Sequence, residues 1–153
     1  MRAIADTGPL VAVIDRAERN HRWAVEQIEG LEAPLLVCEP VLTEAMYLLA
    51  RYPQAQEMLF ELLENGALRL AFKIEENIGA LRKLMHKFRD MPMSLADACV
   101  VRMAEIYEHH TVLTLDADFT VYRKHGRTPL ATHYSGQRVI RSDGVKRRQQ
   151  ERE

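Results

Sequence analysis

The chain has 153 residues, which is the size of one ordinary domain and enough to bury a substantial core. Hydrophobic residues make up 47% and charged residues 28%, a balance that excludes a disordered chain and is ordinary for a soluble globular protein. The formal net charge of −1 gives no global preference for nucleic acid, so any contact of that kind must come from a local patch.

Short β-like runs alternate with helical patterns, which predicts an α/β domain with a largely parallel sheet. In chain order, the strands are expected at residues 2–6, 35–38, 68–72, 112–115 and 129–133. The helices are expected at residues 7–17, 21–31, 41–52, 54–64, 75–88 and 94–109, and a short helical turn should follow the fourth strand. Pro34 and Pro40 bracket the second strand, and Asn65-Gly66 ends the helix before the third.

The periodicity disappears beyond Tyr134, so we expect one domain over residues 1–136 and a flexible polar tail over residues 137–153. Residues 138–153 hold six Lys/Arg against three Asp/Glu, which leaves 15 basic against 19 acidic residues in the rest of the chain. Such a run is typical of a solvated end, and contact with nucleic acid is the alternative.

The two cysteines, Cys38 and Cys99, stand in apolar company without a C-x-x-C or Cys/His metal spacing. We therefore expect reduced thiols in the core. An acid interrupts the N-terminal run MRAIAD too early for a signal peptide, and no apolar stretch approaches membrane-spanning length. These features favour a cytoplasmic protein.

Two acids directly follow apolar strands. Asp6 ends the run AIA and Asp116 ends VLTL, so both should emerge at the carboxyl edge of a parallel sheet. That edge is where α/β proteins place their sites.

Two further acids are predicted to face inward from helices. A count of about 100° per residue places Glu44 on the apolar face formed by Val41, Ala45 and Leu48. The same count puts Asp97 on the apolar stripe of its own helix. Solvated acids belong on the opposite face.

A cluster of these four acids would need a counter-charge. Two carboxylates about 4 Å apart repel by roughly 4 kcal/mol at an effective dielectric constant of 20, so either protons or cations must be present. Oxygen-only ligands suit Mg²⁺ or Mn²⁺. The pattern therefore favours a Mg²⁺-type carboxylate site.

Each acid also has a purely structural explanation. The alternatives are a helix cap at Asp6, a capping box of Ser94 with Asp97, turn positions at Asp116 and Asp118, and a partly exposed helix acid at Glu44. Four such placements in one chain favour a single site.

The stretch VLTLDADFTV, residues 112–121, resembles the first motif of haloacid-dehalogenase-type phosphatases, in which the leading Asp is a nucleophile. That fold places the motif near the start of the chain and needs several further residues on later strands. Here only 35 residues follow Asp118, which leaves no room for them.

A second resemblance covers nearly the whole chain. It rests on four segments in order, DTGPL at 6–10, EPVLTEAMYLL at 39–49, MSLADACVVRMAE at 93–105 and TLDADF at 114–119. Together they resemble the successive signatures of PIN-domain nucleases, especially the VapC-like toxins of bacterial toxin-antitoxin pairs. The resemblance implies a three-layer α/β/α fold with a parallel sheet of four or five strands, and Mg²⁺- or Mn²⁺-dependent cleavage of RNA.

The resemblance also implies roles for individual residues. The metal-binding and catalytic acids of the family fall on Asp6, Glu44, Asp97 and Asp116, and Asp118 matches a second acid that binds metal or supports the site. Thr7 and Thr114 match small polar positions beside the acids. Many relatives have an acid where this chain has Ser94, and the C-terminal tail has no clear counterpart in compact members.

Metal activation of water would remove the need for a histidine base. All six histidines fall outside the four segments, namely His21, His86, His109, His110, His125 and His133. Basic residues around the cleft should hold the RNA, and the candidates, each of which also fits a solvated charge, are Arg51, Arg102, Arg123 and Lys124.

Two classes of function remain. The first is an endoribonuclease toxin, which implies a cognate antitoxin and a homodimer, with the helices at 41–52 and 54–64 as a possible contact surface. The second is a catalytically silent PIN-like binding or assembly module. Retention of all four acids favours the nuclease.

Overall fold

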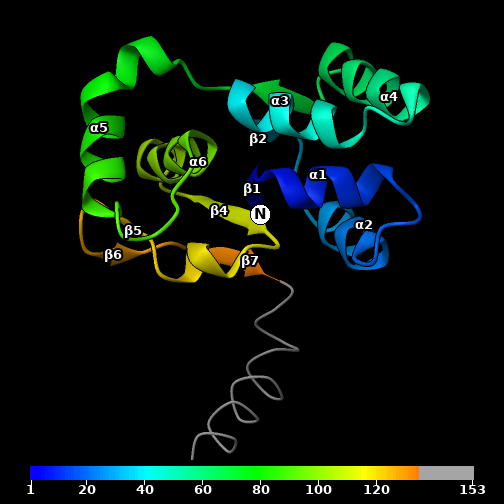
Figure 1. The fold of residues 1–153 in the computed structure, drawn as a ribbon. Helices are drawn as coiled ribbons and strands as arrows, with labels where there is room; N and C mark the ends of the chain where they lie inside the picture. Colours follow the sequence, from blue (N-terminus) through cyan, green and yellow to red (C-terminus); the bar gives the residue numbers. More distant parts are fainter. Residues whose placement is uncertain (135–153) are drawn as a thin grey trace, which may run out of the picture.

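The structure is a computed structural model that describes residues 1–134 (Figure 1). The predicted tail at residues 137–153 and the end of the domain at residue 136 lie outside the described residues. No helix among residues 1–134 is long and apolar enough to cross a membrane.

Five parallel strands form the central sheet in the order β3-β2-β1-β4-β7. Their bounds are Arg2–Ala5 for β1, Leu35–Val37 for β2, Leu68–Leu70 for β3, His110–Thr114 for β4 and Thr132–Tyr134 for β7. The central strands read as short apolar runs because helices cover both faces of the sheet, and most of their side chains are buried. The predicted α/β fold with a parallel sheet of four or five strands is confirmed, and the sheet has five.

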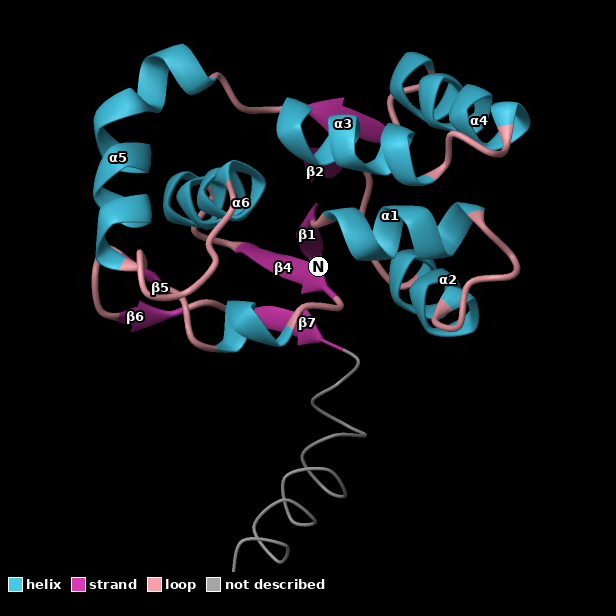
Figure 2. Ribbon diagram, in the orientation of Figure 1, coloured by secondary structure: helices cyan, strands magenta, loops and turns pink. Residues whose placement is uncertain are grey.

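The helices lie on the two sides of this sheet (Figure 2). They are α1 (Thr7–Ile14), α2 (His21–Glu29), α3 (Glu39–Leu48), α4 (Pro53–Glu64), α5 (Ile78–Lys87) and α6 (Leu95–Ile106), with short 3-10 turns η1 (Ile74–Asn77) and η2 (Ala117–Thr120). In this view α5 and α6 lie to one side of the strands, and α1 and α2 lie to the other.

The strand order creates a switch point between β1 and β4. From β1 the chain moves outward through β2 to β3, and it then returns through α5 and α6 to place β4 on the opposite side of β1. Successive right-handed crossovers in opposite directions diverge at such a point and leave a crevice at the carboxyl ends of the two strands. The fold therefore directs the ends of β1 and β4, and the acids after them, to one place.

Several helix boundaries differ from the prediction for local reasons. The sequence predicts a first helix that reaches residue 17, but α1 ends at Ile14 because the Asp15 carboxylate accepts the Ala17 N–H and forms a turn. Pro40 and Pro53 lie in the first turns of α3 and α4, so these helices begin earlier than predicted. Proline suits that position because the first-turn N–H groups have no partner within the helix.

The last predicted strand, at residues 129–133, is shifted in the structure. Residues Thr132–Tyr134 form β7, whereas Thr128–Pro129 form β6, which pairs antiparallel with β5 (Arg123–Lys124). The turn between β5 and β6 includes His125 and Gly126, both with positive φ. Strands of two residues have no periodicity, so the sequence did not indicate this ribbon.

Candidate active site at the carboxyl edge of the sheet

Asp6 and Thr114 lie side by side because β1 and β4 run in register, with Ala5 opposite Leu113. The Thr114 hydroxyl donates to Asp6 Oδ2 at 2.9 Å, and its oxygen accepts the backbone N–H of Asp116 at 2.9 Å. Thr114 is fully buried. One hydroxyl therefore joins the two strand-end acids.

The alternative explanation of Asp6 as a helix cap is not supported. Asp6 stands at the N-cap of α1, yet its side chain makes no capping hydrogen bond. The next residue, Thr7, donates its hydroxyl to Glu44 Oε2 at 2.8 Å. A Cβ atom added at Gly8 would lie 3.2 Å from the Leu115 side chain, so the glycine permits the close approach of α1 to the end of β4.

Asp97 enters the same region from the first turn of α6. Its Oδ2 atom accepts the Ser94 N–H at 3.1 Å, and the Ser94 hydroxyl accepts the Asp97 N–H, so the predicted capping box is present. The inward direction predicted for Asp97 is also confirmed, because it is half-buried on a helix whose following apolar residues are fully buried. The structural and the functional reading of Asp97 are therefore compatible.

Tyr122 is part of this region, although the sequence did not single it out. Its hydroxyl donates to Asp97 Oδ2 at 3.1 Å, the same oxygen that accepts the Ser94 N–H. Its ring is fully buried and packs edge-to-face against Phe88 and Phe119. Tyr122 and the Ser94 backbone therefore hold the same oxygen of Asp97 in place.

The inward orientation predicted for Glu44 is wrong. Glu44 and Leu48 are exposed, and the buried stripe of α3 runs through Val41, Ala45 and Leu49. This stripe is rotated from the predicted face, so Glu44 lies at its margin. Glu44 is therefore a partly exposed helix acid, as the purely structural explanation proposed. It still accepts a hydrogen bond from Thr7, the residue that follows Asp6.

Asp116 and Asp118 form a local turn. The Asp118 N–H donates to Asp116 Oδ1 at 2.9 Å, at the start of η2. The turn reading of these acids is thus confirmed, and both side chains remain half-buried near the carboxyl edge.

The aspartates of the site influence one another electrostatically. The pKa of Asp6 is raised from 3.8 to about 7, mainly by burial. Hydrogen bonds from the Thr7 amide and the Thr114 hydroxyl lower it, and the charges of Asp97 and Asp116 raise it further. Burial and then Asp116 also raise the pKa values of Asp97 and Asp118. Ionisation of each of these carboxyl groups is therefore less favourable than in water, and a nearby cation would stabilise the ionised form.

The donor set fits a hard divalent cation, but the cage is not preformed. Within residues 1–134, no group of three Asp, Glu, His or Cys side chains is already placed to hold one metal ion. Carboxylates of like charge repel one another, so closing them around a single point requires the cation itself. Acid oxygens and neighbouring hydroxyls are ligands and supports that suit Mg²⁺ or Mn²⁺.

Comparison with known proteins identifies the fold family. A family model described as the PIN domain matches residues 3–124. The chain belongs to the PIN domain family. Ribonuclease VapC26 of Mycobacterium tuberculosis is 33% identical over 115 residues, which cover 74% of this chain and 85% of that protein. The crystal structure of Mycobacterium tuberculosis VapC20, described as a sarcin-ricin loop cleaving toxin, matches with a TM-score of 0.70 at 15% identity, over 78% of this chain and 93% of that one.

In this PIN domain, the other polar residues considered from sequence have mainly structural partners. His21 Nδ1 lies 2.7 Å from the Ala12 carbonyl oxygen, and His125 lies beside Glu105 and Glu108. Of the basic candidates, Arg123 donates to three backbone carbonyls of its own turn.

The same PIN domain buries both cysteines. Cys38 and Cys99 are free and fully buried, as predicted.

Proposed function

We propose that this protein is a metal-dependent endoribonuclease that acts as the toxin of a toxin-antitoxin pair. The observation that carries this proposal is the convergence of Asp6, Asp97 and Asp116 at the switch point of a PIN fold, with Glu44 joined to them through Thr7. The relative named Ribonuclease VapC26 supports RNA as the substrate. An RNA substrate in turn favours action in the cytoplasm.

The residues have distinct roles in this proposal. Asp6, Glu44, Asp97 and Asp116 hold Mg²⁺ or Mn²⁺, as PIN nucleases generally depend on a divalent metal, and Asp118 supports Asp116 or adds a ligand. The chemistry that such a cation supplies when bound is activation of water and neutralisation of charge on the attacked phosphate.

The hydroxyl groups of the site act on the acids. Thr114 orients Asp6, Thr7 orients Glu44, and Tyr122 together with Ser94 fixes one oxygen of Asp97. Partners of this kind set the direction and basicity of ligand oxygens. The chain thus supplies both the ligands and the groups that align them.

Replacement of Asp97 by asparagine tests the proposal. Asp97→Asn keeps the side-chain oxygen for the capping box and removes the charge, so we expect loss of Mg²⁺-dependent RNA cleavage while a cooperative thermal unfolding transition shows that the fold is retained. Glu26→Gln, an exposed acid on α2, is the matched control and should cleave like the wild type. Unchanged cleavage by purified Asp97→Asn would contradict the assignment.

The alternative function is a catalytically silent PIN-like module. Titration calorimetry with Mn²⁺ separates the two, because a nuclease of this kind should bind the ion and Asp6→Asn should not. If wild type and Asp6→Asn both failed to bind Mn²⁺ and behaved identically on structured RNA, the silent module would be the better description.

An antitoxin and a second copy of the chain are the proposed protein partners. Apolar side chains on α3, on α4 and between them are exposed, and core packing does not account for them; they are Tyr47, Leu48, Tyr52, Met58 and Phe60. Apolar groups of this size favour a protein contact when they gather on one region. We assign this region to the antitoxin. Copurification with a short DNA-binding protein encoded immediately upstream tests that assignment, and light scattering tests the homodimer.

A further inference from the structure

The helix α5 carries an uncompensated positive charge. Its ten residues include Arg82, Lys83, His86 and Lys87 and no acid, whereas residues 1–137 as a whole hold more acidic than basic groups. All four of these side chains are exposed. Within residues 1–134, none of them forms an ion pair with a carboxylate. These four residues are called the basic face of α5.

Helix stability explains only part of this charge. His86 and Lys87 lie in the last turn of α5, where a positive charge interacts favourably with the helix dipole. Arg82 and Lys83 lie in the middle of the helix and gain little from that effect. Their presence without an acid partner among residues 1–134 points to a ligand of opposite charge.

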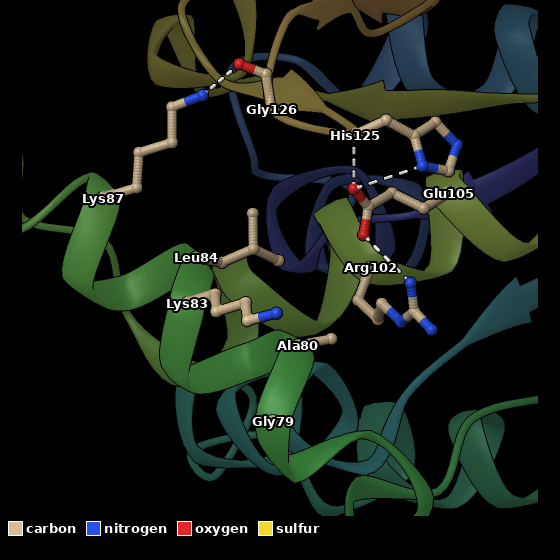
Figure 3. Close-up of a pocket in the computed structure, with 9 residues that line it drawn as sticks. All are labelled: Gly79, Ala80, Lys83, Leu84, Lys87, Arg102, Glu105, His125 and Gly126. Atoms are coloured by element: carbon tan, nitrogen blue, oxygen red, sulfur yellow. Dashed lines mark hydrogen bonds and ion pairs between the residues drawn. The ribbon is translucent and has the colours of Figure 1, made fainter.

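A pocket of about 490 Å³ opens beneath this face, between α5, α6 and the turn from β5 to β6 (Figure 3). Lys83 and Lys87 line it from α5, Arg102 from α6 and His125 from the turn. Among the described residues of the lining the single acid is Glu105, which accepts hydrogen bonds from the Arg102 guanidinium at 3.2 Å and from the His125 backbone N–H.

These contacts leave the pocket positively charged. The Arg102 charge offsets that of Glu105, and the Lys87 ammonium group donates to the neutral carbonyl of Gly126. The charges of Lys83 and Lys87 therefore remain for a bound anion.

Two packed aromatic rings separate the end of the basic face from the acids. Phe88 directly follows Lys87, its ring centroid lies 5.2 Å from that of Tyr122, and the Tyr122 hydroxyl reaches Asp97. The C-terminal end of α5 therefore lies near the acidic site.

We propose that the basic face of α5, with the pocket beneath it, binds the phosphate backbone of single-stranded RNA and delivers the strand to the carboxyl edge of the sheet. This inference rests on the proposed function. The carboxylates of the site repel a polyanion, so the substrate needs cationic contacts beside them. Lysine and arginine contacts to phosphates position a strand without reading its sequence, so this surface sets affinity and register.

The test compares two double variants. Arg82→Gln with Lys83→Gln removes two charges from α5, and Arg19→Gln with Arg22→Gln removes two exposed charges in and before α2, on the other side of the molecule (Figure 1). Binding of a fluorescent single-stranded RNA is measured by anisotropy at increasing KCl concentration, in an Asp97→Asn background so that the RNA stays intact. Thermal unfolding of both pairs confirms that the fold is retained.

The α5 pair should weaken RNA binding about 10-fold at low salt, and the slope of log K against log salt should fall by about 1.4, which is roughly 0.7 for each phosphate that is no longer neutralised. The control pair should keep the wild-type slope. With Asp97 restored, the α5 pair should raise the KM for RNA cleavage and leave kcat unchanged.

Equal slopes for the two pairs would overturn this inference, and if the wild type still cleaved RNA the proposed function would stand. Absence of cleavage by the wild type would instead overturn the proposed function, while a selective loss of slope in the α5 pair would still support an RNA-binding surface. If the α5 pair lost binding to an acidic polypeptide but kept its RNA affinity, the basic face would be a protein interface.

Discussion

The Tyr122 hydroxyl and the Ser94 N–H donate to the same oxygen of Asp97, each at 3.1 Å. This pair of donors holds the carboxylate in one orientation. The pKa of Tyr122 lies well above its usual range. Burial is the main cause, and the nearby carboxylates of Asp97, Asp118 and Asp116 raise it further. The phenol therefore keeps its proton and remains a donor.

Tyr122→Phe removes this donor and keeps the buried ring. We expect the affinity for Mn²⁺ and the rate of RNA cleavage each to fall about 10-fold, because loss of an outer partner of a metal ligand has an effect of that size. Tyr107→Phe is the matched control, since it removes a hydrogen bond of 2.7 Å to the Ala71 carbonyl at a distance from the acids. Both variants should lose about 1 kcal/mol of stability. Calorimetric titration with equal Mn²⁺ affinity in both would refute the role of Tyr122.

Thr114→Val keeps the shape of a fully buried side chain and removes the hydroxyl between Asp6 and Asp116. The Asp116 N–H loses its acceptor, which costs about 1–3 kcal/mol of stability, and Asp6 loses a donor to its charged form. We therefore expect weaker Mn²⁺ binding near neutral pH. Thr111→Val, at the other end of β4, should bind Mn²⁺ like the wild type; a similar loss there would mean that strand packing, and not the hydroxyl, is responsible.

The raised pKa of Asp6 predicts how the stability of the metal-free protein depends on pH. The folded protein keeps the Asp6 proton up to about pH 7, whereas the unfolded chain loses it near pH 4, so this stabilising contribution is complete below pH 4 and disappears as the pH rises toward 7. Asp6→Asn has no such proton to lose. In the presence of a chelator, its melting temperature should therefore rise relative to that of the wild type over this interval.

The pKa values of Asp97 and Asp118 are also raised, and both residues remain in Asp6→Asn. Part of the pH dependence of stability should therefore persist in this variant. Addition of Mg²⁺ should restore the wild type near pH 7 and have little effect on Asp6→Asn. Melting curves of the two proteins that run parallel from pH 4 to pH 7 would disprove the link to Asp6.

Local features of the site were predictable because they depend on neighbours in the chain. The capping box joins Ser94 to Asp97 across three residues, and the turn joins Asp116 to Asp118 across two. The parallel sheet followed from the alternation of apolar runs and helical patterns, and parallel strands place their carboxyl ends at one edge. For these reasons the sequence alone was enough to bring Asp6 and Asp116 to a common edge.

The tertiary structure decided what depends on contacts between distant segments. The buried stripe of α3 is set by the elements that pack on it, so Glu44 lies at its margin and reaches the site through Thr7. Tyr122, which follows η2 in the chain, meets Asp97 only because the fold brings this segment back to the first turn of α6. The basic residues of α5 and of the turn at His125 become one pocket only when the helix packs against that turn. Sequence periodicity records which side of a helix is apolar, whereas the partner that covers it, and the polar groups at the boundary, depend on how the layers pack.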